Sequence, residues 1–138
     1  MYKNILVPID LAHKETAGPM IEAAKALADK DAKLTLLYVM PEMPGIVAVH
    51  LPPGSADEAK ARSEAELRDL AKQGSGSDQV DAVTSIGPPH HVILRTAADD
   101  GIDLIVIASH QPEFSDYLLG SVAAKVVRHA PCSVHVIR

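Results

Sequence analysis

Short, almost unbroken apolar runs are the feature that most constrains the fold. Residues 4–10, 33–40 and 104–108 read NILVPID, KLTLLYVM and LIVIA. A run without polar alternation indicates a strand that is covered on both faces, which is typical of a parallel sheet with crossover helices on both sides. Runs of this length are too short to span a bilayer. The chain is therefore expected to be an α/β protein.

Helical patterns separate these runs, and two further strands complete the pattern. The expected helices cover residues 11–31, 55–73, 90–100 and 120–129, and the added strands cover 79–85 and 133–137. For the first helix, Pro19 leaves open a later start around Gly18 and Pro19, with proline in the first turn. Strands and helices then alternate along the whole chain. Right-handed crossovers turn such an alternation into one open, doubly wound parallel sheet, here with five strands and four helices. The last strand is expected at an edge of the sheet.

One connection is too long for an ordinary turn. Residues 41–54, PEMPGIVAVHLPPG, are rich in proline and glycine and carry apolar side chains. Long loops in compact domains are often lids, contact surfaces or disordered segments. We expect this loop to flank the functional site or an oligomer contact, and disorder is the open alternative.

Composition excludes several classes of function. The 138 residues fit one domain, only 3% are aromatic, and the net charge is −5. Nucleic-acid modules need stacking aromatics or a basic surface, so no nucleic-acid partner is expected. Cys132 is the only cysteine, which excludes an intrachain disulfide and favours a small buried side chain. The N-terminal residues resemble no secretory signal, so a cytoplasmic protein without membrane contact is expected.

Two short stretches are candidate site residues. Asp10 follows the first strand, and open α/β sheets bind ligands at the carboxyl ends of their strands. Gly120 and Ser121 begin the last helix, where Gly120 permits close backbone approach and Ser121 is expected to cap the helix. The N–H groups of Ser121 and Val122 would then cradle a phosphate. The structural alternative is that Asp10 and Ser121 only cap helices.

Histidines give a weaker signal. His110 is a candidate for acid–base chemistry or metal ligation, but lining a loop is the simpler interpretation. His90 and His91 are adjacent and do not share one face of a helix. No Ser-His-Asp arrangement and no Walker motif can be identified. A histidine-dependent enzyme or a metal protein is the third and least favoured interpretation, and no catalytic or metal-ligating residue is assigned.

The chain resembles the universal stress protein family over its whole length. The matching stretches are YKNILVPID at 2–10, DLIVIASH at 103–110 and LLGSVAAKVVRHAPCSVHVIR at 118–138. The Ala-Ser-His-x-Pro form of the loop at 108–112 resembles a subgroup of the family that is similar to its ATP-binding branch. The resemblance implies a single Rossmann-like domain over residues 1–138 with the strand order 3-2-1-4-5.

The resemblance also implies an adenine-nucleotide site. Pro8, Ile9 and Asp10 would border the adenosine, Val39 would present backbone groups to the adenine, and Ile107 would pack on the base. Ser109, His110 and Gln111 would line the phosphates, which Ser121 and Val122 would cradle. The family pattern is Gly-x-x-Gly, nine residues, then Gly-Ser or Gly-Thr. Its glycines fall on Ala108, Gln111 and Gly120, so only Gly120 keeps the glycine.

The implied function is that of a cytoplasmic stress-response protein. It would bind ATP or AMP, with or without Mg²⁺, and act as a nucleotide-dependent switch or adaptor with at most slow ATP hydrolysis. The alternative is a dimerisation or adaptor module whose nucleotide site is degenerate, because Ala108 and Gln111 replace glycines. Pairing of the C-terminal edge strand would give a homodimer, or a tetramer built from it.

Overall fold

The computed structural model describes residues 1–75, 80–109 and 120–138. The strands are β1 (Tyr2–Pro8), β2 (Ala28–Met40), β3 (Val80–Ile86), β4 (Leu104–Ala108) and β5 (Ser133–Ile137). The helices are the 3₁₀ helix η1 (Leu11–Thr16), α1 (Ala17–Leu27), α2 (Gly45–Ala48), α3 (Ser55–Ser75), α4 (Pro89–Asp99) and α5 (Ser121–His129).

The strands form one parallel sheet in the order β3-β2-β1-β4-β5, which confirms the predicted fold class and strand order. The central strand is β1, where Leu6 pairs with Thr35 of β2 on one side and Ile105 of β4 on the other. The chain winds outward from β1 in both directions. The carboxyl ends of β1 and β4 therefore lie side by side at the point where the strand order reverses.

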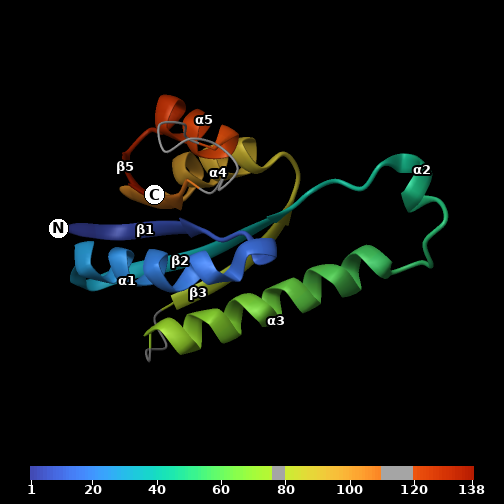
Figure 1. The fold of residues 1–138 in the computed structure, drawn as a ribbon, viewed down its shortest axis with the longest axis horizontal. Coiled ribbons are helices and arrows are strands. Elements are labelled where there is room, and N and C mark those ends of the chain that lie inside the picture. Colours follow the sequence, from blue (N-terminus) through green and yellow to red (C-terminus); the bar gives the residue numbers. More distant parts are fainter. Residues whose placement is uncertain (76–79, 110–119) are drawn as a thin grey trace.

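Helices cover both faces of this sheet. One layer contains α1 and α3, and the other contains α4 and α5, as Figure 1 shows. The neighbouring residues Ile5 and Leu6 are both fully buried, yet they belong to the two opposite cores. Because successive side chains of a strand point to opposite faces, a strand covered on both sides must be apolar at every position. This explains the unbroken apolar runs.

The helix predicted over 11–31 is wrong in these bounds, whereas the alternative start around Gly18 and Pro19 agrees with α1, which begins at Ala17. Its first part is the 3₁₀ helix η1, and α1 ends at Leu27 because Ala28 is already extended, with φ −83° and ψ 143°. Ala28 pairs with Tyr2, and the amino group of Met1 forms an ion pair with Asp29. Contacts with the start of β1 thus extend β2 into a stretch that local preference would assign to a helix.

The predicted long loop contains the short helix α2. The sequence analysis predicted four helices and so omitted both α2 and the 3₁₀ helix η1. All residues from 41 to 54 are exposed. Ile46 and Val49 are 78% and 80% exposed, and in Figure 1 α2 stands away from the sheet. Only Pro41, at the root of this segment, reaches the cavity described below.

Hydrogen bonds of Asp103 and Asn4 join β1 to the turn that precedes β4, and we call this group of bonds the clasp. The carboxylate of Asp103 accepts the N–H groups of Lys3 at 2.8 Å and Asn4 at 3.0 Å. The Asn4 side chain in turn donates to the carbonyl oxygens of Asp100 at 2.8 Å and Gly101 at 3.2 Å. These bonds fix the two central strands relative to each other. They therefore also fix the strand ends that carry the candidate site.

Candidate functional site

A cavity of about 420 Å³ lies at the carboxyl ends of β1, β2 and β4. This is the position at which sheets of this topology bind ligands. The predicted site residues on its wall are Pro8, Ile9, Asp10, Val39, Ile107, Ala108, Gly120, Ser121 and Val122. Among the predicted residues that the structure describes, only Ser109 does not line the cavity. His110 and Gln111 lie outside the described residues.

One part of the cavity is an apolar slot. It is lined by the buried side chains of Ile9, Val39, Ile93 and Ile107. The Ile9 N–H donates to the carbonyl of Leu37 at 2.8 Å, and Val39 lies two residues further along β2. Since backbone groups of alternate residues point to the same side of a strand, the N–H and C=O of Val39 face the space beyond β1. The slot thus offers apolar walls and a backbone donor–acceptor pair to a flat heterocycle.

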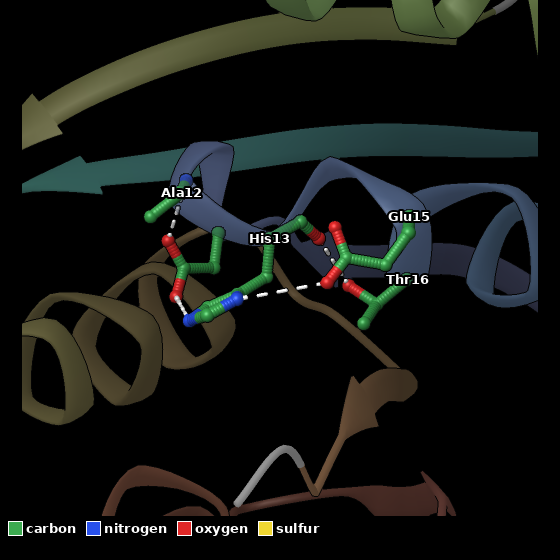
Figure 2. Close-up of polar contacts among 5 residues, drawn as sticks. Ala12, His13, Glu15 and Thr16 are labelled. Atoms are coloured by element: carbon green, nitrogen blue, oxygen red, sulfur yellow. Dashed lines mark hydrogen bonds and ion pairs between the residues drawn. The ribbon is translucent and has the colours of Figure 1, made fainter. Parts of the chain in front are cut away.

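Asp10 and His13 form a polar corner at the start of η1, and Figure 2 shows His13 with its neighbours Ala12, Glu15 and Thr16. The Asp10 carboxylate accepts the N–H of Ala12 at 2.9 Å, and its other oxygen is 3.9 Å from His13 Nε2. His13 Nδ1 lies 3.6 Å from a carboxylate oxygen of Glu15, and the Thr16 hydroxyl donates to the His13 carbonyl at 2.9 Å. Asp10 therefore caps η1 and also lines the cavity, so the two sequence-based interpretations are compatible.

Tyr38 adds a phenol to the same wall. Burial raises the pKa of Tyr38 above its ordinary value of 10.0, and the nearby negative charges of Asp10 and Glu66 raise it further. The hydroxyl therefore stays protonated at neutral pH and can donate a hydrogen bond. The polar side of the cavity thus combines a carboxylate, an imidazole and a phenol.

The start of α5 forms a further part of the cavity wall, next to the end of β4. Gly120 is the N-cap residue, with φ −58° and ψ 153°, and Ser121 is the first helical residue. The prediction that Ser121 caps the helix is wrong, because no side-chain capping bond is present and Ser121 is one position too late for that role. The first intrahelical bond runs from the Ala124 N–H to the Gly120 carbonyl at 2.8 Å. Earlier N–H groups have no intrahelical acceptor.

Ser109 connects this helix start to the neighbouring strand. Its hydroxyl accepts the Gly120 N–H at 3.2 Å, and its own N–H donates to the carbonyl of Ile137 in β5 at 2.8 Å. Ser109 thus ties the loop end of β4 both to α5 and to the edge strand. The resemblance implies that Ser109 contacts the phosphates, but Ser109 does not line the cavity.

Sequence reasoning missed several wall residues, among them His13, Thr16, Tyr38 and Pro89. Tyr38 could have been predicted from the sequence, because it directly precedes Val39 near the end of the same strand. His13 could not, because it lies in a 3₁₀ helix whose non-helical backbone at this residue, with φ −131° and ψ 59°, leaves no local pattern in the sequence. Pro89 depends on Gly87, whose φ of +148° permits the turn into α4.

The described residues contain neither a metal-binding cluster nor a membrane-spanning helix. Within residues 1–75, 80–109 and 120–138, no group of three or more His, Cys, Asp or Glu side chains is placed to hold a metal ion. Among the helices in these same ranges, none combines the length and apolar character needed to cross a membrane. Cys132 is half-buried rather than buried, and burial together with the charge of Asp103 raises the pKa of its thiol.

Known proteins match the chain from end to end. A family model described as the universal stress protein family covers residues 1–138. Universal stress protein G of Salmonella typhimurium is 32% identical over 145 residues, spanning 100% of both chains. The solved universal stress protein UspA from Lactobacillus plantarum has 31% identity and a TM-score of 0.70, covering 99% of this chain and 98% of that one.

A more distant solved structure carries a ligand. It is a universal stress protein family protein from Arabidopsis thaliana with AMP bound. It is 20% identical, has a TM-score of 0.65, and covers 98% of this chain and 90% of that chain. At this level of identity the similarity concerns the fold.

Proposed function

Because the chain belongs to the universal stress protein family, we propose that its central cavity binds an adenine nucleotide, ATP or AMP, and that binding switches the protein between states of assembly or partner contact. The observation that carries the proposal is the joining, in one cavity, of an apolar slot and a helix start where the N–H groups of Ser121 and Val122 have no acceptor among the described residues. A nucleotide has the matching two ends, a flat base and an anionic phosphate.

The residues present fit such a ligand. The base would lie in the slot between Ile9 and Ile107, with its polar edge toward the backbone of Val39. Asp10 would accept a hydrogen bond from a ribose hydroxyl, since its carboxylate lies on the wall between the slot and η1. The phosphate would lie at the start of α5, where Ser121 and Val122 line the cavity. The solved relative of the same fold that carries AMP supports a nucleotide as the ligand.

The proposed switch needs a route from the ligand to the rest of the molecule. Ser109 supplies one, because it bonds to Gly120 at the helix start and to Ile137 in β5. One side of β5 pairs with β4, and β5 is the last strand of the sheet. A phosphate that shifts the start of α5 would therefore also act on this edge strand. The homodimer proposed through β5 is the assembly that would respond.

The second candidate is an adaptor module that binds no nucleotide. The observation in its favour is Ala108, which lines the cavity where the family pattern has a glycine. Its methyl group occupies space into which a ligand would otherwise approach the backbone. In that case β5 would mediate a dimer whose assembly does not depend on a ligand.

Thermal stability of the nucleotide-stripped protein separates the two candidates. Ligands that bind the native state raise its melting temperature. We expect ATP, ADP or AMP to raise it for the wild type, and GMP to do so much less. Ala108→Leu places a larger side chain in the cavity and should abolish the shift, whereas Ala26→Leu on the exposed side of α1 should retain it. No shift with any adenine nucleotide would reject the binding proposal and favour the adaptor.

A further inference from the structure

We propose that residues 41–54 form an arm through which two copies of this chain associate, each arm adding as an extra strand to the open edge of β3 in the other copy. This interface is separate from the pairing of β5 and does not depend on nucleotide binding. Three features of the described residues support it: the apolar side chains that the arm exposes, the preference of these residues for extended structure, and the unpaired edge of β3.

The exposed apolar side chains are concentrated in two segments. Of the large apolar side chains that are exposed in the described part of the chain, all but Met1 and Val127 lie in the arm or in β3. Those of the arm are Met43, Ile46, Val47, Val49 and Leu51, and those of β3 are Val83 and Ile86. Monomeric proteins rarely leave so much apolar surface uncovered, so the two segments are expected to have a partner.

The arm has the composition of a strand, although part of it is helical here. Residues 45–51 read GIVAVHL, and the β-branched Ile46, Val47 and Val49 favour extended structure. Yet Gly45–Ala48 form the single helical turn α2, which stands away from the sheet in Figure 1. So short a helix is not stable without tertiary contacts. Opening it into a strand therefore costs little and suits its residues better.

The edge of β3 offers a place for such a strand. β3 pairs with β2 and is outermost in the sheet, and no described strand pairs with its other side. The Thr84 N–H donates to the Glu64 carboxylate at 3.4 Å, a long bond that a carbonyl of an added strand would replace. Val83 and Ile86 are 41% and 47% exposed. An open, apolar strand edge is a template for a further strand.

Charge and area favour a second copy of the chain as the partner. Glu42 and His50 are the only ionisable side chains of the arm, and Asp81 of β3 is paired with Lys33 at 3.3 Å. Two chains of net charge −5 therefore meet here without unpaired like charges facing each other. The side chains expose on the order of 700 Å² per copy, so mutual exchange buries about 1,400 Å², within the range of stable interfaces.

Lysine variants test whether the arm mediates assembly. Val49→Lys places a charge on the proposed strand, which opposes strand addition, and its position is 80% exposed, so folding should be unaffected. Ala26→Lys on the exposed side of α1 is the control. Sedimentation equilibrium should give the wild type and Ala26→Lys twice the mass of Val49→Lys, whether or not β5 also pairs. Equal masses for the wild type and Val49→Lys at all concentrations would overturn the proposal.

Cross-linking between copies identifies the surface that the arm contacts. In a Cys132→Ser background, which removes the only native cysteine, a Val49→Cys protein is mixed with a size-tagged Val83→Cys protein under mild oxidation. We expect disulfide-linked heterodimers to form at least about tenfold faster than with Val127→Cys in place of Val49→Cys. No excess over this control would overturn the proposal. A bond formed only within one chain of the Val49→Cys, Val83→Cys double variant would do so too, because the arm would then close on its own sheet.

Discussion

The N–H of Gly120 donates to the hydroxyl of Ser109 across 3.2 Å, which joins the start of α5 to the end of β4. The two residues are 11 positions apart, and the segment between them lies outside the described residues. This bond decides how many donors the helix start retains for a ligand. It also places the first turn of α5 beside the strand ends.

Ser109→Ala should lower the free energy of unfolding by about 1 kcal/mol, because the buried N–H of Gly120 would lose its acceptor. Ser109→Thr keeps a hydroxyl and should recover most of this loss. Urea denaturation at neutral pH measures both variants. Equal stability of Ser109→Ala and the wild type would show that the bond does not contribute to folding.

Asp103→Ala should destabilise the protein by about 1–3 kcal/mol, since it removes the acceptor of the Lys3 and Asn4 N–H groups at the start of β1. The comparison variant is Asp31→Ala, which removes an exposed aspartate and should change stability by less than about 0.5 kcal/mol. Denaturant midpoints of the two variants provide the measurement. Similar losses in both would contradict a specific role for the clasp.

Leu67→Ala should cost about 2–5 kcal/mol, because Leu67 is fully buried and anchors the long helix α3 on the sheet. Leu51→Ala makes the same chemical change at a side chain that is 39% exposed and should cost far less. Thermal or urea unfolding followed by circular dichroism tests the pair. A small effect of Leu67→Ala would mean that α3 is held by other contacts.

Stability should also fall at alkaline pH through Tyr38. The folded state raises the pKa of this phenol above 10.0, so the unfolded chain releases the proton at a lower pH than the native protein does. The contribution is complete below pH 10.0 and disappears as the pH rises through the folded-state pKa. Stability measured against pH in the wild type and in Tyr38→Phe gives the difference due to this residue.

Two outcomes of that titration are informative. In Tyr38→Phe the loss of stability above pH 10.0 should be shallower, and Asp10→Asn should reduce the loss partly, because the Asp10 charge contributes to the shift. Identical pH profiles for Tyr38→Phe and the wild type would mean that the phenol has the same pKa in the folded and unfolded chains.

Much of the fold could be predicted because a strand that is buried on both faces is apolar at nearly every position of its sequence. Leu104–Ala108 and Ser133–Ile137 agree with β4 and β5 to the residue. The error at residues 28–31 has a different origin, since a register shift between Tyr2 and Asn4 and the pairing of Tyr2 with Ala28 extend β2. Such pairing depends on residues far away in the sequence, which local patterns do not contain.

The site was predictable where it follows from strand ends and helix starts. Asp10 and Gly120 are of this kind, because topology alone brings the ends of β1 and β4 together with α5, whereas Ile107 was expected from the family resemblance. The role of Ser109 was not predictable in this way. Its hydroxyl is engaged by Gly120, and that depends on side-chain geometry rather than on position in a motif.

The central claim is that a phosphate lies at the start of α5, and titration of three proteins with AMP tests it most directly. Ser121→Glu adds a negative charge at the first helical position, which favours the helix and repels a phosphate. Ser121→Gln has nearly the same shape without the charge. We expect one AMP per chain for the wild type and Ser121→Gln, and loss of binding in Ser121→Glu. AMP binding with equal affinity to Ser121→Glu and Ser121→Gln would contradict the claim.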